Sequence, residues 1–212
     1  MSDTGGGHRA AAEAIRDGLY TRHGEDNIDA EIIDVFRLTN FPMNYAPGMY
    51  PWIINRIKDS WGFGYNLSNT RRRAAVLSRT FYMANARRFK RMARENPVDV
   101  VVCVHSVIAR PSLRAWQSLP ERPPFVTVVT DLVTTHMFWY DAEADLTMVP
   151  TQTAYDRGLQ AGLLPEKMKL TGLRVNPGFM AKLVGKEQAG DNLGWQQGKV
   201  TILMVAGGDG MG

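Results

Sequence analysis

Short runs of β-branched and other apolar residues alternate along the chain with longer stretches in which apolar positions recur at helical spacing. The runs predict strands at 30–36, 98–105, 125–130, 146–149, 168–171 and 199–205. The stretches between them predict helices at 8–23, 70–95, 109–119 and 152–162. Near-continuous apolar strands that alternate with helices are typical of a parallel sheet covered on both faces. The sequence therefore predicts a Rossmann-like, doubly wound α/β fold.

Glycine-rich turns stand at both ends of this pattern. Gly5, Gly6 and Gly7 precede the first predicted helix with almost no strand before them, and residues 207–212 follow the last predicted strand. Glycines let the backbone approach a ligand closely, and the free N–H groups at a helix start attract anions. A tight turn without a ligand is the alternative at either place. We expect 1–175 to form one domain that lacks most of its first strand, and 176–212 to begin a second domain with a linker, a strand and a glycine turn.

His8 follows the first glycine turn directly and falls in the first turn of the predicted helix. The helix dipole disfavours a cationic imidazole there, so His8 is predicted to be neutral at pH 7. A neutral imidazole is suited to taking a proton from a hydroxyl nucleophile. The alternative is a histidine that only caps or hydrogen-bonds the turn.

A polar and aromatic segment follows the predicted strand at 125–130. Because ligands of open α/β sheets bind beyond the carboxyl ends of the strands, this segment is a candidate binding site. Asp131 is suited to orienting a substrate hydroxyl or a histidine, and Trp139 to stacking on a sugar or an acyl chain. His105 ends the preceding strand and is expected to face the same crevice. Alternatively, His136 is a loop residue with satisfied hydrogen bonds, and the neighbouring aromatic residues are part of the core.

Composition places the chain among globular proteins, because 44% of its 212 residues are hydrophobic and 22% are charged. The single cysteine, Cys103, lies in an apolar run and is expected in the core, which favours a reducing cytoplasmic compartment. No stretch approaches the roughly 20 apolar residues that span a bilayer, and the first residues do not have the pattern of a signal peptide. Any membrane contact is therefore expected to be peripheral.

Charge is distributed unevenly. Residues 69–94 contain nine lysines and arginines and no acidic residue, although the formal net charge of the chain is only +4. The segment 41–65 just before them holds seven of the twenty aromatic residues and a short amphipathic pattern at 52–58. An amphipathic aromatic element beside a cationic one is typical of peripheral binding to anionic lipid. The residues expected at the membrane are Trp52, Trp61, Arg87, Arg88 and Arg91.

The basic segment also fits two different roles. The aromatic segment could be a lid packed on the domain, with the arginines on a solvated helix face. Nucleic acid is a second possible anionic partner, but proteins that bind it interleave stacking aromatic residues with the cations. Here Phe81, Tyr82 and Phe89 have a spacing that also fits a core stripe, so no nucleic-acid partner is expected.

Five motifs, in order along the chain, carry a family resemblance. They are SDTGGGHRA at 2–10, VTDL at 129–132 with His136 and Trp139 behind it, VPT at 149–151, TGLRVNP at 171–177 and GGDGMG at 207–212. With these motifs the chain resembles the monogalactosyldiacylglycerol synthases and the related processive diacylglycerol glucosyltransferases. In place of the family's His-Pro pairs, this sequence has His105-Ser106 and His136-Met137, which weakens the expectation of acceptor contacts at both positions.

The resemblance implies a GT-B architecture, in which an N-terminal Rossmann-like domain takes the lipid acceptor and a C-terminal one takes the UDP-sugar. It also implies transfer of a hexose to 1,2-diacylglycerol with inversion, usually without a bound metal or another cofactor. Matched by position, His8 and Asp131 are catalytic, and Gly208, Gly210 and Gly212 approach the nucleotide sugar. The implied acceptor-binding residues are Gly6, Gly7, His105, His136 and Trp139.

The residues that hold the nucleotide in such enzymes are not found in this sequence, so we expect this chain by itself to be inactive. Two alternative functions follow from the same features. One is a transferase that acts on a polyprenyl-diphosphate lipid in cell-wall synthesis. The other is a non-catalytic module that binds lipid surfaces.

Overall fold

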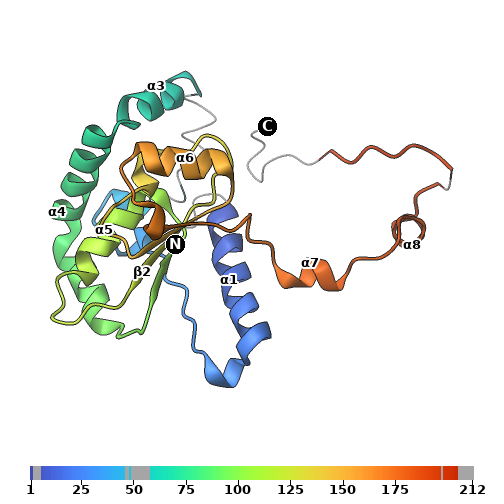
Figure 1. The fold of residues 1–212 in the computed structure, drawn as a ribbon, viewed down its shortest axis with the longest axis horizontal. Helices are drawn as coiled ribbons and strands as arrows, with labels where there is room; N and C mark the ends of the chain where they lie inside the picture. Colours follow the sequence, from blue (N-terminus) through green and yellow to red (C-terminus); the bar gives the residue numbers. More distant parts are fainter. Residues whose placement is uncertain (2–5, 46–47, 49–57, 197, 205–212) are drawn as a thin grey trace.

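The computed structural model describes residues 1, 6–45, 48, 58–196 and 198–204 (Figure 1). Its centre is a sheet of four parallel strands in the order β1-β2-β3-β4. The strands are β1 (Val101–Cys103), β2 (Phe125–Val128), β3 (Leu146–Val149) and β4 (Met168–Leu170). The register pairs Val101 with Phe125, Val126 with Leu146, and Thr147 with Met168. The Rossmann-like parallel α/β class predicted from the sequence is confirmed.

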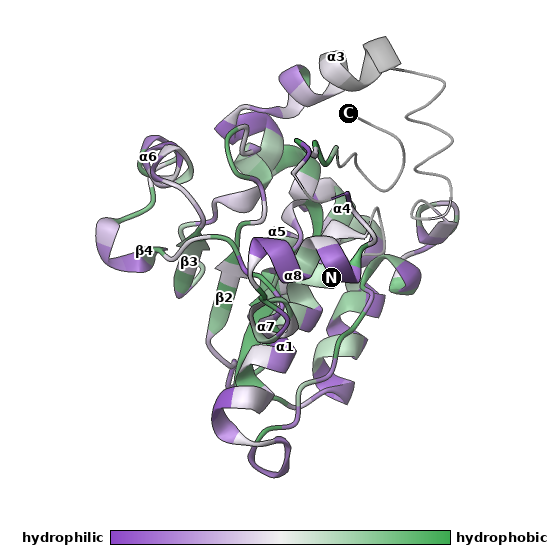
Figure 2. Cartoon of the chain, turned by 90° about the vertical axis from the view of Figure 1, so that its right-hand side faces the viewer, coloured by the Kyte–Doolittle hydropathy of each residue, from purple (hydrophilic) through white to green (hydrophobic). Residues whose placement is uncertain are grey.

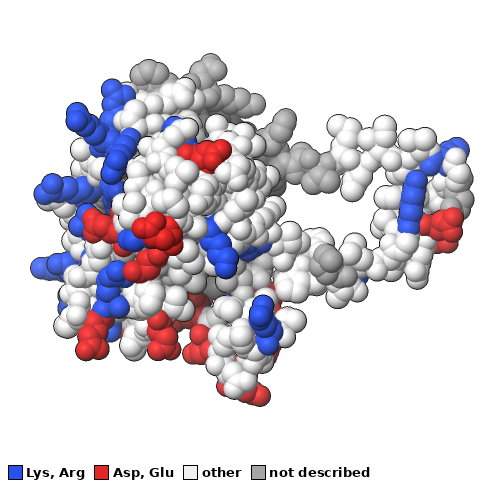
Figure 3. All heavy atoms as spheres, in the orientation of Figure 1, with Lys and Arg blue, Asp and Glu red and all other residues white. Residues whose placement is uncertain are grey.

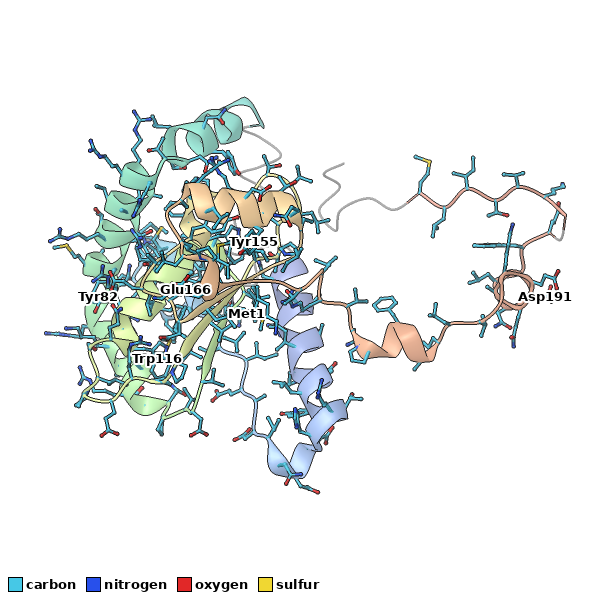
Figure 4. The ribbon with its side chains drawn as sticks, in the orientation of Figure 1. Met1, Tyr82, Trp116, Tyr155, Glu166 and Asp191 are labelled. Carbon is cyan, nitrogen blue, oxygen red and sulfur yellow. The ribbon has the colours of Figure 1, made fainter. Side chains whose placement is uncertain are left out.

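Helices cover both faces of the sheet. On one face, Ala11 of α1 (Gly7–His23) packs with Val104 and Val128. On the other, α4 (Arg71–Glu95) and α5 (Ser106–Trp116) enclose a larger cluster that includes Phe89 and Phe125. In Figure 2 the strands β2 and β3 are coloured as hydrophobic, in keeping with burial between these layers. Trp116 is buried, and Tyr82 packs against the same cluster (Figure 4).

The remaining helices connect and extend this body. Helix α6 (Gln152–Gln160) joins β3 to β4, and α3 (Lys58–Ser68) precedes α4. Helices α7 (Pro177–Ala181) and α8 (Lys186–Asn192) lie in the segment that leads away from the sheet in Figure 1. Short 3-10 turns occupy Glu25–Asn27, Phe36–Leu38, Met43–Tyr45, Met137–Trp139 and Pro165–Lys167; the fourth is labelled η4 below.

Side-chain caps explain where several helices begin. Thr70 accepts a hydrogen bond from Arg73 N at the start of α4, and Thr151 caps α6 in the same way. Helix α5 begins at Ser106, earlier than the predicted residue 109, because the His105 side chain accepts a hydrogen bond from the first turn. A side-chain acceptor at this position satisfies one of the free N–H groups of the helix start.

The strand predicted at 30–36 is wrong. The backbone there is extended, and its bonds run to Met1: Met1 N donates to Ile33 O at 2.7 Å and Val35 N donates to Met1 O at 3.0 Å. A parallel ladder needs a series of partners along the neighbouring strand. Met1 is the only described residue that offers such bonds, and the chain turns into a 3-10 helix from Phe36.

The strand predicted at 199–205 is not formed over its described part, 199–204. Val200 is 93% exposed and Met204 is 89% exposed, so these apolar side chains have no sheet or helix against which to pack. A strand requires such pairing and burial to be stable. The glycine turn expected at 207–212 lies outside the described residues, and so does the predicted helix at 52–58 except for Lys58, where α3 begins.

Candidate active site

His8 lies at the start of α1 and reaches the carboxyl end of β1. Its Nδ1 is 2.8 Å from the carbonyl oxygen of Val104 and 3.4 Å from Thr130 Oγ1, just beyond β2. A carbonyl oxygen can only accept a hydrogen bond, so Nδ1 of His8 carries the proton. The lone pair of the neutral ring is then on Nε2. This is the tautomer that a proton acceptor needs.

Burial is the leading cause of a lowered pKa at His8, and the hydrogen bond to Val104 and the charge of Asp131 partly oppose it. The pKa therefore falls below the ordinary value of 6.5, and the imidazole is neutral at pH 7. The sequence predicted the direction of this shift. It attributed the shift to the helix dipole, whereas the structure gives burial as the main cause.

Asp131 and Trp139 are brought together beside His8. Trp139 Nε1 donates to Asp131 Oδ2 at 2.7 Å, which fixes the orientation of the carboxylate. The indole is fully buried, and its ring centre is 6.2 Å from that of His8. Trp139 thus orients Asp131 in this structure, and its predicted stacking on the acceptor stays a prediction.

His105 packs directly against His8, with 4.2 Å between the ring centres. Its Nδ1 accepts from Val107 N at 3.2 Å, and the side chain is buried. Burial, with the charge of His8 next in size, holds the pKa of His105 well below 6.5. His105 is therefore a neutral cap beneath His8, and its predicted contact with the acceptor stays a prediction.

His136 belongs to a different set of contacts. Its ring contacts those of Tyr65 and Phe138, with ring centres 4.9 Å and 4.3 Å away, and its Nε2 is 3.0 Å from Ser68 Oγ. Burial lowers the pKa of His136 to about 4. These contacts match the alternative in which His136 is a loop residue with satisfied hydrogen bonds. A contact between His136 and the acceptor stays a prediction.

The glycine turn before His8 is open. Gly6 precedes α1 with φ of −53° and ψ of −11°, values accessible to any residue, and a Cβ at Gly6 or Gly7 would meet nothing within 4 Å. Neither backbone conformation nor packing among the described residues requires glycine here. Because glycine has no side chain, a ligand can approach the N–H groups at the start of α1.

Sequence reasoning missed two groups that fix the His8 ring. Thr130 stands beside Asp131 in the VTDL motif, so its position after β2 was the available signal. No sequence pattern identifies the Val104 carbonyl, because every residue has a backbone carbonyl. Trp52, Gly208, Gly210 and Gly212 lie outside the described residues, and Trp61 lies in α3.

The basic helix predicted from the sequence is confirmed as α4, and its cations line one side of the molecule. In Figure 3 they form the blue projections along the left edge. Arg87, Arg88 and Arg91 are exposed, as are Val76 and Met83 of the same helix, which are 63% and 65% exposed. Arg91 forms an i,i+4 ion pair with a glutamate at 3.8 Å.

The aromatic residues of α4 face inward, as a core stripe would. Phe89 is 1% exposed, and Phe81 and Tyr82 pack against the same core cluster. Phe89 is therefore closed to stacking on bases, and Phe81 and Tyr82 are partly buried. No helix within the described ranges is long and apolar enough to cross a membrane.

Comparison with known proteins agrees with this architecture. The sequence model of the family described as monogalactosyldiacylglycerol (MGDG) synthase matches residues 8–175, a range that starts at His8 and ends beyond β4. Similar proteins include a probable monogalactosyldiacylglycerol synthase, chloroplastic, of Nicotiana tabacum, which is 32% identical over 100% of this chain and 40% of its own length. The matched region thus contains every candidate catalytic residue.

Two further relatives give the same result. Monogalactosyldiacylglycerol synthase, chloroplastic, of Spinacia oleracea is 31% identical over 100% of this chain and 41% of its own length. Monogalactosyldiacylglycerol synthase 2, chloroplastic, of Arabidopsis thaliana is 30% identical, and this chain covers 46% of it. The chain spans less than half the length of these relatives. Because the family model covers most of the chain, the chain belongs to the monogalactosyldiacylglycerol synthase family.

Proposed function

We propose that this chain forms the acceptor-binding part of a glycosyltransferase that moves a hexose from a UDP-sugar to 1,2-diacylglycerol with inversion. The observation that carries the proposal is the state of His8. The ring is neutral, its Nδ1 is bonded to Val104 O, and Asp131 stands nearby at the carboxyl ends of parallel strands. Membership of the monogalactosyldiacylglycerol synthase family supports this choice of reaction.

The chemistry needs only a base and an oriented acceptor from this chain. Nε2 of His8 takes the proton of the free glycerol hydroxyl as that oxygen attacks the anomeric carbon. The bond between the anomeric carbon and the UDP oxygen breaks on the opposite face, so UDP leaves and the configuration is inverted. Asp131 favours the imidazolium that forms, because its charge raises the pKa of His8.

The glycine turn assigned to the donor side lies outside the described residues. Residues 176–212 would begin the domain that binds the UDP-sugar, with Gly208, Gly210 and Gly212 near its phosphates. Gly6 and Gly7 would take the acceptor side, where the open helix start offers N–H groups to oxygen atoms of the lipid. The proposed reaction uses no bound metal or other cofactor, as the family resemblance implies.

The same proposal places the protein at a membrane surface, where its acceptor resides. The exposed arginines of α4, together with exposed Val76 and Met83, combine charge with apolar side chains on one helix. Anionic lipid attracts such a surface, and apolar side chains beside the cations add to the binding. We therefore expect peripheral binding to anionic membranes.

An acceptor competition assay tests the function. An enzyme that joins this chain to a UDP-sugar-binding domain is offered UDP-galactose or UDP-glucose with vesicles containing diacylglycerol, a polyprenyl diphosphate lipid, or both. We expect hexose on diacylglycerol alone. Transfer to the polyprenyl lipid would support the cell-wall alternative, and vesicle binding with no transfer to either lipid would support a binding module.

A further inference from the structure

Polar side chains at the end of α3 reach the loop that follows β2. The three that do so, called the α3 cluster here, are Tyr65, Ser68 and Asn69. The Tyr65 hydroxyl donates to Thr134 O at 3.0 Å. Asn69 Oδ1 accepts from Met137 N at 3.0 Å, and Ser68 Oγ lies 3.0 Å from His136 Nε2. Two residues in the last turn of α3 and the residue that follows it thus hold Thr134, His136 and Met137 of the loop.

The contact between Ser68 and His136 has a definite direction. Nδ1 of His136 accepts from Phe138 N at 3.1 Å, so in the neutral ring the proton is on Nε2. His136 therefore donates to Ser68 Oγ, whose own hydroxyl donates to Gly64 O at 2.7 Å. One side of the His136 ring caps η4 (Met137–Trp139) and the other side joins it to α3.

Helix η4 leads from the α3 cluster to the candidate catalytic pair. Its last residue is Trp139, and Trp139 Nε1 holds Asp131 Oδ2 at 2.7 Å. Asp131 in turn raises the pKa of His8 through its charge. Contacts therefore join α3 to η4 and η4 to Asp131, and the charge of Asp131 acts on His8.

Separate tethers hold different parts of the loop. Thr151 Oγ1 donates to Leu132 O at 2.6 Å. Tyr140 OH donates to Ala154 O of α6 at 2.8 Å and accepts from Thr135 Oγ1 at 2.8 Å. Both fix the loop against the α6 side of the sheet. Asn69 holds η4, the turn that carries Trp139, because its Oδ1 accepts a hydrogen bond from Met137 N.

We infer that the α3 cluster is a positioning site for Asp131: Tyr65, Ser68 and Asn69 hold η4 so that Trp139 keeps the Asp131 carboxylate turned toward His8. The inference rests on the proposed function, in which His8 and Asp131 work as a pair. It assigns to α3 a role in the chemistry, although α3 contributes no reacting group. The cluster acts through the loop, so none of its members is a catalytic residue.

The pKa of His8 reports on this role without an activity assay, and the chain's four histidines keep its imidazole NMR spectrum simple. We propose to titrate the unmodified chain, the double variant Tyr65→Phe/Asn69→Ala, and Asp131→Asn. The matched control is Tyr82→Phe/Asn96→Ala. Tyr82 OH bonds a backbone oxygen of α5 at 3.4 Å, and Asn96 bonds within its own helix end, so the control makes the same chemical changes away from the loop.

Asp131→Asn is expected to lower the pKa of His8, because it removes the nearby negative charge. The double variant of the α3 cluster should lower that pKa by roughly half as much, since Asp131 is no longer held in place. The amide of Met137 should also exchange faster with solvent. The control should leave the His8 pKa unchanged even if it lowers the melting temperature equally.

Two results would overturn the inference, and they are distinguishable. If Asp131→Asn lowers the His8 pKa but the α3 double variant does not, the cluster does not position Asp131 and the proposed function stands. If Asp131→Asn itself leaves the His8 pKa unchanged, Asp131 and His8 do not act as a pair, and the proposed function is contradicted as well. An equal change of the His8 pKa in the control would show that general destabilisation causes the change, and it would also contradict the inference.

Discussion

His8→Ala is expected to lower hexose transfer to diacylglycerol by roughly 10²-fold or more, the range typical of a lost general base. The reason is that the neutral His8 ring carries its lone pair on Nε2 at the carboxyl ends of β1 and β2, whereas Nδ1 of the neutral His105 already accepts from Val107 N. Because burial lowers the pKa of His8, the unprotonated base persists as the pH falls below 6.5. The transfer rate should therefore stay constant as the pH falls to 6.5, and it should decline only as the pH passes through the lowered pKa of His8.

The matched control is His23→Ala, at the exposed far end of the same helix. It should change neither the rate nor its pH dependence. Initial rates at saturating UDP-sugar, with melting temperatures to confirm folding, make the comparison. An unchanged rate in His8→Ala would remove His8 as the base and leave Asp131 as the candidate.

Reversing three charges on α4 should produce the second large effect. The triple variant Arg87→Glu, Arg88→Glu and Arg91→Glu is expected to bind anionic vesicles about 100-fold more weakly, because each cation near such a surface contributes about 1 kcal/mol. The unmodified protein should bind vesicles containing anionic lipid and bind neutral ones poorly. Sedimentation with vesicles of both compositions at about 0.15 M salt measures this difference.

A control with the same change in net charge separates the role of α4 from that of overall charge. Arg22, Lys169 and Lys186 are exposed cations on different elements, and their replacement by glutamate should weaken binding much less. Equal binding by the α4 triple variant and the unmodified protein would count against membrane contact through this helix. Equal weakening in both triple variants would show that only net charge matters.

The sequence predicted the sheet well because its strands carry their own signal. The runs at 125–130, 146–149 and 168–171 are apolar and bounded by turns, and they became β2, β3 and β4. The runs at 30–36 and 199–205 have the same local pattern but no ladder among the described residues. Strand formation depends on partners far along the chain, which a local pattern cannot reveal.

The sequence predicted the positions of the candidate residues better than their contacts. His8 and Asp131 were placed correctly at the strand ends, because the glycine turn and the VTDL motif fix where they fall. Trp139 looked like a surface for ligand stacking, yet it is fully buried and bonds Asp131. Trp139 is buried in a core cluster with Val129, Val149 and Ala154, partners that a local sequence pattern does not identify.

Nitrogen NMR of the His8 ring tests the central claim most directly. At pH 7, ¹⁵N chemical shifts should show a neutral imidazole with the proton on Nδ1 and the lone pair on Nε2, and the ring should titrate below pH 6.5. This result would leave a base facing the acceptor side of the sheet. A proton on Nε2, or a ring that is already cationic at pH 7, would contradict the account.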